Sequence, residues 1–320
     1  MTLRTAILGL GIMGRRMLEH MHRHEGYAPD LLWDPSESAC AEALKLHPGA
    51  TVTESPEAAI SGADLVYLAC PPEPRKALAL AAAGAGKAVF LEKPLGVDVA
   101  ASEDLVARLA EAGVPAAVNF TQAAGPAMTS VVAAAKDGTL GALAGADIVV
   151  TYAAWPREWQ KAAEWLRFRA EGGFTREVIS HFLFFTERVL GPLRLVHTHP
   201  THPADPALCE SHMLARLESA TGLPVTVMGA VGGAQPDRQE LTIKGAAESR
   251  RVADFYREAA SRGGPFEPVR PEPSDPRAES LRCQLDDLRL LMEGRPHRLA
   301  TPEEALRVQR LIEGMLAGAG

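Results

Sequence analysis

The sequence predicts an α/β protein: a doubly wound parallel sheet, followed by an α+β domain with an open mixed or antiparallel sheet. In the first third of the chain, short apolar strand-like runs alternate with helix-like segments, the order that produces a parallel sheet. A glycine-rich turn follows the first of these runs. After about Thr121 the strand-like runs become longer, with few helices between them, as in an antiparallel or mixed sheet. We therefore expect domains at residues 1–121 and 122–320.

The elements follow from the spacing of apolar residues. Ser102 is a candidate N-cap because acids follow it, and Thr301 precedes a proline at the first position of the last helix. A proline-rich stretch at 263–276 is expected to be a surface loop. The expected helices lie from about residue 13, at 38–46 and 75–83, from Ser102, and in two closing segments. The expected strands are 5–8, 31–33, 63–69, 88–91, 115–118, 146–152, 193–196, 212–217, 225–228 and 240–244.

The composition is that of an ordinary globular protein, with 47% hydrophobic and 23% charged residues. A net charge of −7 argues against binding to nucleic acid or to an anionic membrane. The sequence has no apolar run of transmembrane length and no signal-peptide pattern, and its four cysteines form no CxxC pair. We therefore expect a cytoplasmic protein that binds neither nucleic acid nor membrane.

The glycine-rich turn reads Gly9-Leu10-Gly11-Ile12-Met13-Gly14, a GxGxxG motif. In dinucleotide-binding folds the first glycine permits a tight turn and the second lets a pyrophosphate approach. The third lets the helix pack closely on the strand. The motif alone is a weak signal, but here it follows a strand and opens a helix. We expect a Rossmann domain whose cofactor contacts include Gly9, Gly11, Ile12, Met13 and Gly14.

Asp34 ends the second predicted strand, about 20 residues beyond the motif. A carboxylate there would accept hydrogen bonds from the adenosine ribose and repel the 2′-phosphate of NADP, so NAD is favoured and NADP stays possible. The alternative interpretation of Asp34 is a turn residue before Pro35. Arg15 and Arg16 lie near the expected phosphates and could serve NADP, but a solvated helix face is the simpler interpretation.

Lys93 lies in Glu92-Lys93-Pro94, directly after the buried strand predicted at 88–91. Pro94 cannot continue the strand, so the chain turns there. Lys93 is thus placed at the carboxyl end of a strand, where open α/β sheets bind their ligands. For an isolated lysine, solvation of the strand end would be the more common role, but the neighbouring nucleotide-binding motif favours a functional one.

A second candidate site follows the pair Gly172-Gly173, which would let the backbone approach a flat cofactor ring. We expect a largely buried helix with Thr175 as its N-cap. Glu177 and His181 would share one face of this helix, and the helix dipole favours an ionised Glu177. That carboxylate can orient an imidazole and stabilise its protonated form, which makes His181 a candidate general acid or base. A structural Glu–His pair in a core helix is the alternative.

Together these features resemble the Gfo/Idh/MocA (glucose–fructose oxidoreductase / inositol dehydrogenase) family over nearly the whole chain. The resemblance implies a Rossmann domain and an α+β domain whose open sheet forms homodimers or homotetramers. It also implies hydride transfer between NAD(P) and a sugar, polyol or related alcohol or carbonyl. The features that carry it are the glycine-rich motif, Asp34, Cys70-Pro71-Pro72, Glu92-Lys93-Pro94, the GG-x-x-x-acid-x-x-x-His element and the closing Thr301-Pro302-Glu303-Glu304-Ala305-Leu306.

The resemblance also implies residue roles. Lys93 would bind and polarise the reacting oxygen, His181 would exchange the proton, and Glu177 would orient His181 or bind a neighbouring hydroxyl. No metal ion is expected, because no acid or cysteine lies close beside the His197-Thr198-His199 histidines in the sequence. The cofactor would be lined by Cys70, Pro71, Pro72, Glu92 and Lys93, and the substrate by Trp155, Trp165 and Arg167.

Three positions depart from the family pattern. At the position of Glu177 the family more often has Asp, whose side chain is shorter by about 1.5 Å. Phe184 stands where many sugar-active members of the family have an Asp. Arg75 stands where the family usually has a His. The first two suggest a substrate less hydroxylated than inositol, or held differently. A redox-neutral NAD-dependent glycosidase or epimerase remains an alternative, as does a non-catalytic nucleotide sensor. The sensor is disfavoured because Lys93 and His181 are both present.

Overall fold

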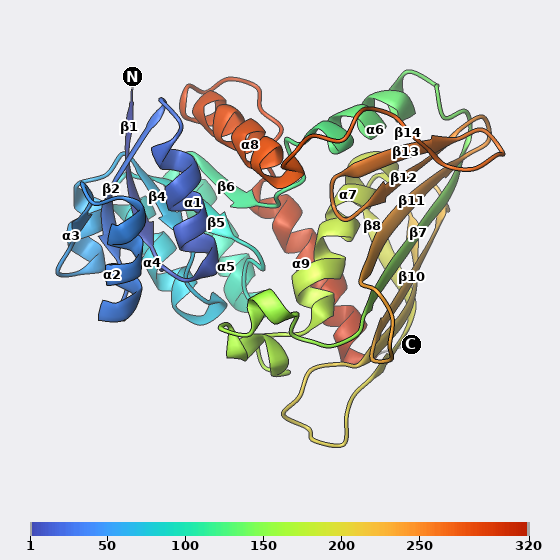
Figure 1. Cartoon of the computed structure of the whole chain (residues 1–320), viewed down its shortest axis with the longest axis horizontal. Coiled ribbons are helices and arrows are strands. Elements are labelled where there is room, and N and C mark those ends of the chain that lie inside the picture. Colours follow the sequence, from blue (N-terminus) through green and yellow to red (C-terminus); the bar gives the residue numbers. More distant parts are fainter. Residues whose placement is uncertain (1, 319–320) are drawn as a thin grey trace. The chain divides into compact units, whose positions relative to one another are not determined.

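In a computed structural model, which describes residues 2–318, the chain forms two compact units (Figure 1). The first unit contains the chain up to Phe120 together with Leu281–Leu306. The second contains Thr121–Ser280 and the chain from Arg307. No helix within the described residues is long and apolar enough to cross a membrane.

The first unit is built on a six-stranded sheet in the order β3-β2-β1-β4-β5-β6, and all neighbouring strands run parallel. The strand order reverses between β1 and β4, and ligands bind at such a switch point in doubly wound sheets. The strands are β1 (Leu3–Leu8), β2 (Tyr27–Trp33), β3 (Thr51–Val52), β4 (Leu65–Leu68), β5 (Ala88–Glu92) and β6 (Ala116–Asn119). The helices are α1 (Ile12–His22), α2 (Glu37–Leu46), α3 (Pro56–Ser61), α4 (Pro72–Gly84) and α5 (Val99–Ala112).

Helix α8 (Pro276–Met292) contributes to the core of this first unit. Its Leu281, Leu285 and Leu288 pack in one buried cluster with Ile7 and Met17. The sequence had suggested that everything after residue 121 belongs to the second domain. The structure differs because the apolar face of α8 is buried against the parallel-sheet unit, which removes that surface from water.

The second unit is built on an eight-stranded sheet in the order β14-β13-β12-β11-β7-β10-β9-β8. Only β7 and β10 pair in parallel; the other neighbours are antiparallel. Strand β9 alternates exposed and buried residues, as expected for a sheet with one solvated face. The strands are β7 (Leu143–Tyr152), β8 (Leu193–Thr201), β9 (His212–Ser219), β10 (Pro224–Val231), β11 (Arg238–Gly245), β12 (Ser249–Ala253), β13 (Arg257–Ser261) and β14 (Glu267–Pro268). The helices are α6 (Pro126–Lys136), α7 (Ser180–Leu190) and α9 (Pro302–Ala317), which begins in the first unit.

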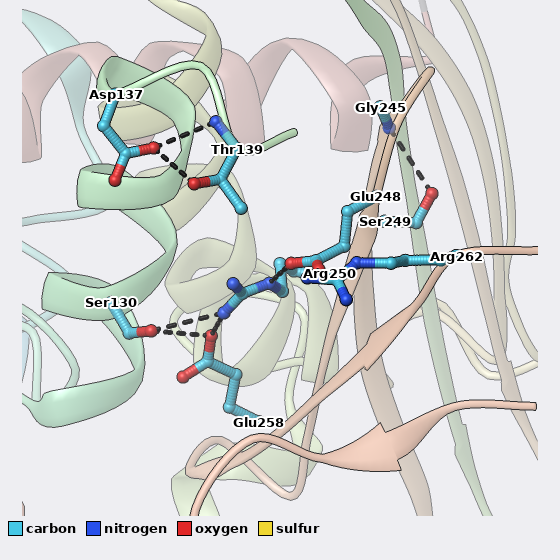
Figure 2. Close-up of polar contacts among 9 residues, drawn as sticks. All are labelled: Ser130, Asp137, Thr139, Gly245, Glu248, Ser249, Arg250, Glu258 and Arg262. Atoms are coloured by element: carbon cyan, nitrogen blue, oxygen red, sulfur yellow. Dashed lines mark hydrogen bonds and ion pairs between the residues drawn. The ribbon is translucent and has the colours of Figure 1, made fainter. Parts of the chain in front are cut away.

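A buried ionic cluster connects α6 to the edge of this sheet (Figure 2). Arg250 lies between two carboxylates, with its Nε 2.5 Å from Glu248 and its Nη1 paired with Glu258. Ser130 of α6 donates to Glu258 at 2.9 Å. Burial raises the pKa of the Glu258 carboxyl, and the contacts with Ser130 and Arg250 oppose that shift.

The predicted fold class is confirmed, and so are most of the predicted elements. Helix α9 begins with a capping box. Thr301 Oγ1 accepts from the Glu304 N–H, and the Glu304 carboxylate accepts from the Thr301 N–H. The prediction that Ser102 caps α5 is wrong, because Asp98 occupies that position and accepts from the Ala101 N–H at 2.6 Å. The β-strands and α-helices that the sequence did not predict are β3, α3, α6 and β12–β14.

Candidate functional site

The loop between β1 and α1 has the backbone that its glycines predict. Gly9 has a φ of 96°, and a Cβ added there would lie 2.5 Å from the Cys70 nitrogen. A Cβ on Gly14 would lie 1.9 Å from the Gly9 carbonyl oxygen. At Gly11, in contrast, nothing lies within 4 Å of such a Cβ. Two glycines thus permit close packing, and the third leaves room for a ligand, as a pyrophosphate site requires.

Helix α1 begins at this loop without a side-chain cap. Its N-cap is Gly11, and its first turn contains no acid. The first N–H groups of the helix can therefore bind an anion, and the helix dipole favours negative charge there. Ile12 and Met13 form this first turn and are half-buried. The Arg15 guanidinium donates to the Leu10 carbonyl at 2.6 Å, so Arg15 is tied to the loop and does not simply face solvent.

Asp34 is held beside the same loop. One carboxylate oxygen accepts from the Leu10 N–H at 2.6 Å, and the other accepts from the Ser36 N–H at 2.8 Å. Each carboxylate oxygen can accept a further hydrogen bond. The position at the end of β2 and the remaining acceptor capacity both fit the ribose of an adenine dinucleotide.

Lys93 and Pro94 are partly buried and follow the last residue of β5. The preceding Glu92 is only 5% exposed, and its carboxylate accepts from the Tyr67 hydroxyl and, at 2.6 Å, from the Asn119 amide. Burial raises the pKa of Glu92, whereas these two hydrogen bonds lower it. The Glu92 side chain is therefore engaged within the sheet, toward β4 and β6.

Arg75 connects the turns that follow β4 and β5. It is 3% exposed, and its guanidinium donates to the carbonyls of Cys70, at 2.5 Å, and Pro94. Cys70 is a buried free cysteine, and burial raises the pKa of its thiol. Pro71 and Pro72 lead from it into α4. The sequence analysis singled out Arg75 as a departure from the family pattern but predicted no contact for it.

The segment before α7 differs from the predicted single α-helix. Thr175–Ile179 forms a π-helical turn, and α7 begins at Ser180. The prediction that Thr175 is an N-cap is wrong, because its hydroxyl is buried without a hydrogen-bond partner. Instead, the Thr175 N–H donates to the Glu210 carboxylate at 2.7 Å. π-Helical turns often occur at functional sites.

The glycine pair before this turn permits close packing inside the second unit. A Cβ on Gly172 would lie 2.3 Å from the Leu166 carbonyl oxygen. A Cβ on Gly173, which has a φ of 103°, would lie 2.4 Å from the Glu210 carboxylate. The observed neighbours of both glycines are therefore parts of the same unit, whereas the sequence had suggested a cofactor ring.

Glu177 is linked to two residues that the sequence analysis missed. Its carboxylate accepts from the Gln160 amide at 3.3 Å, and Gln160, 2% exposed, accepts from the Arg157 guanidinium at 2.8 Å. Arg157 also lies over the rings of Tyr152 and Trp159. His181 is 6% exposed. A buried glutamine next to a predicted acid had no local sequence signal, since Gln160 lies far from Glu177 in the chain.

The remaining predicted residues lie on nearby segments of the second unit. The Trp155 indole donates to the Leu166 carbonyl at 2.9 Å. Trp165 and Arg167 lie on a short 3₁₀ turn, and Arg167 is exposed. Phe184 is buried in α7. The predicted catalytic residues are thus divided between the units, with Lys93 in the first and the other two in the second.

Residues 3–120 match the family model of Gfo/Idh/MocA, described as an oxidoreductase family with an NAD-binding Rossmann fold. The inositol 2-dehydrogenase of Mycolicibacterium smegmatis is 36% identical over 115 residues, which are 35% of this chain and 33% of that protein. The chain therefore aligns with about a third of the length of this curated relative.

Solved structures extend the similarity to the whole fold. An oxidoreductase from Agrobacterium radiobacter, in complex with NAD⁺, L-tartaric acid and magnesium, has a TM-score of 0.85 at 14% identity, covering 99% of this chain and 97% of that one. GenD2 from gentamicin A biosynthesis, in complex with NAD, has a TM-score of 0.82 at 19% identity, with coverages of 99% and 94%. The WlbA dehydrogenase from Bordetella pertussis, in complex with NADH and UDP-GlcNAcA, has a TM-score of 0.81 at 20% identity, with coverages of 99% and 95%.

The parallel sheet, its glycine loop and Asp34 define a Rossmann-type dinucleotide-binding protein. More specifically, its residues 3–120 match the Gfo/Idh/MocA model of oxidoreductases with an NAD-binding Rossmann fold. The family resemblance and the NAD-type cofactor predicted from the sequence are therefore confirmed.

Proposed function

We propose that this protein is an NAD-dependent oxidoreductase that transfers a hydride between nicotinamide and a sugar, polyol or related alcohol or carbonyl. The observation that carries the proposal is Lys93, placed at the carboxyl end of β5 in a unit with an open Gly11 and a loop-bound Asp34. The similarity of residues in this unit to an inositol 2-dehydrogenase supports an alcohol substrate.

The proposed roles follow from the chemistry of each side chain. The N–H groups at the start of α1 bind the phosphates, and Asp34 binds the ribose. Bound NAD supplies the acceptor or donor of the hydride. The Lys93 ammonium binds the reacting oxygen and stabilises the negative charge that develops on it. His181 takes the hydroxyl proton in oxidation and returns it in reduction, and Glu177 orients the imidazole.

The Lys93→Met variant tests this proposal. An absorbance screen at the NADH band, with NAD⁺ and NADP⁺ across sugars, polyols and hydroxy acids, first identifies a substrate. We expect Lys93→Met to abolish turnover of that substrate while NADH binding, followed by fluorescence, stays nearly unchanged. Loss of both properties, or of neither, would contradict the proposed role. Net formation of NADH excludes a redox-neutral glycosidase or epimerase.

The homodimer or homotetramer and the cytoplasmic location expected from the sequence stay predictions. The solvated face of the second sheet exposes Val196, Leu214 and Met228, by 44%, 54% and 38%. These apolar side chains lie on the neighbouring strands β8, β9 and β10, which supports a homodimer or homotetramer formed through this face. Light scattering of the purified protein would test the assembly.

A further inference from the structure

The turn between β12 and β13 has an unusual backbone. Asp254 and Phe255 are the two non-glycine residues with positive φ in the described part of the chain, at 50° and 69°. The Tyr256 N–H donates to the Ala253 carbonyl at 3.1 Å, which closes a β-turn around them. Two left-handed central residues are typical of a type I′ turn, which favours Asn-Gly or Asp-Gly. A phenylalanine therefore occupies the position that favours glycine.

Contacts on both sides hold this turn in place. A bulky residue in the left-handed region is strained by about 1–2 kcal/mol, so its surroundings must fix it. The Phe255 carbonyl accepts from the buried Gln122 amide at 2.8 Å. The Asp254 carboxylate pairs with Arg257 at 2.9 Å, and the Asp254 N–H donates to the Gln239 carbonyl at 2.9 Å.

The Phe255 ring packs against two consecutive residues of α7. It stacks on Phe182, with ring centroids 5.2 Å apart and an interplanar angle of 16°. It meets the His181 imidazole edge to face, with centroids 5.3 Å apart and an angle of 83°. Edge-to-face contacts are worth about 0.5–1.5 kcal/mol and depend on ring orientation. Rotation of the buried imidazole would lose this contact.

We propose that Phe255 is a positioning residue for His181: the strained turn holds the phenyl ring against the imidazole and fixes its orientation for proton transfer. This inference rests on the function proposed above, in which His181 exchanges the proton. It explains why the turn tolerates strain. Glycine would form the hairpin more easily, but it would remove the edge-to-face contact with the imidazole.

The Phe255→Gly variant removes the ring without adding backbone strain, because glycine adopts the positive φ of this position readily. The first readout is the Hε1 signals of the ten histidines in a ¹H–¹³C spectrum of the full chain. The signal lost in His181→Gln identifies His181. We expect this signal to change more than any other histidine signal in Phe255→Gly. The separate variant Phe255→Tyr, which keeps the ring, should show the His181 signal of the wild-type protein.

Phe266→Ala is the matched control. Phe266 lies in the next turn of the same sheet, between β13 and β14, and its ring packs on Arg251 of β12. We expect it to leave the His181 signal unchanged. The second readout is turnover of NAD⁺ with the alcohol identified by the absorbance screen. We expect kcat to fall on the order of tenfold in Phe255→Gly, because small misplacements of catalytic groups are costly. Phe255→Gly should bind NADH as the wild-type protein does. The separate variant Phe255→Tyr should keep the turnover of the wild-type protein.

A folded Phe255→Gly protein with the wild-type His181 signal and turnover would overturn the inference. Should that variant unfold below the assay temperature, Phe255→Leu, which keeps apolar bulk without a planar ring, is judged by the same two readouts. If the wild-type protein transfers no hydride with either cofactor, the proposed function fails. The His181 signal then decides by itself whether Phe255 positions the imidazole.

Discussion

Three charged side chains at the carboxyl ends of the parallel strands are each held by the backbone or by neighbouring strands. Asp34 receives the Leu10 N–H, Arg75 donates to two carbonyls, and Glu92 accepts from Tyr67 and Asn119. Side chains that are already ordered lose less entropy when a ligand binds. The first unit is therefore organised for binding before a cofactor arrives.

The charge of Asp34 is expected to set the preference for NAD over NADP. Asp34→Asn keeps an oxygen that can accept from the Leu10 N–H but removes the repulsion of a 2′-phosphate. We expect the affinity for NADPH relative to NADH to rise about tenfold, equivalent to about 1.4 kcal/mol. Fluorescence titration with both cofactors measures this ratio.

Asp30→Asn is the control for this prediction, because Asp30 lies on the same strand and its carboxylate contacts His47 at 3.1 Å. It should leave the ratio of affinities unchanged. An unchanged ratio in Asp34→Asn would show that Asp34 does not select the cofactor.

At the scale of elements, the π-helical turn before α7 shows how a distant side chain replaces a local cap. The Thr175 N–H is satisfied by Glu210, and Gly173 provides the space for that carboxylate. Burial raises the pKa of Glu210, and its hydrogen bonds with Thr175 oppose the shift. In the folded protein the protonated form of Glu210 is thus favoured relative to the unfolded chain.

The raised pKa of Glu210 makes the stability of the fold depend on pH. Below the unfolded pKa, near 4.5, the protonated side chain contributes its full stability. That stability is lost as the pH rises through the folded pKa. Glu210→Gln keeps an acceptor for the Thr175 N–H and cannot ionise. We expect the variant to gain stability relative to wild type between pH 5 and pH 8, by on the order of 1 kcal/mol.

Urea unfolding at the two pH values tests this expectation, and the exposed Glu158→Gln, on a short turn of the same unit, serves as control. A stability difference between Glu210→Gln and wild type that is constant with pH would show that Glu210 has the same pKa in the folded and unfolded chain.

The elements that the sequence missed have physical explanations. Strand β12 buries a charged side chain, Arg250, which is compensated by Glu248 and Glu258 (Figure 2). A buried ion pair interrupts the apolar alternation from which strands are predicted. The short elements β3 and α3 have 2 and 6 residues, which is too few for a clear periodic signal.

At the scale of the whole molecule, the first unit is completed by a segment from the far end of the chain. Leu285 of α8 is fully buried in the cluster that contains Ile7 and Met17. We expect Leu285→Ala to destabilise this unit by about 2–5 kcal/mol through loss of apolar contact and the cavity left behind. Thermal unfolding with and without NADH measures the loss.

Leu290→Ala, in the same helix but only partly buried, is the control and should cost less. If Leu285→Ala unfolded with wild-type stability and kept the same stabilisation by NADH, α8 would not be part of the nucleotide-binding unit.

The sequence by itself determined the parallel-sheet fold of the first unit and the positions of its candidate residues, but not that α8 completes the unit. The glycine motif, Asp34 and Lys93 could be predicted because each is defined by its spacing from a strand that is itself visible as an apolar run. Local spacing also predicted most strands of the second sheet. By contrast, only the tertiary structure decided that Glu210 serves Thr175 and that Phe255 packs on His181. The partners in these pairs lie far apart in the chain, and their contacts depend on how the elements pack, which no local pattern records.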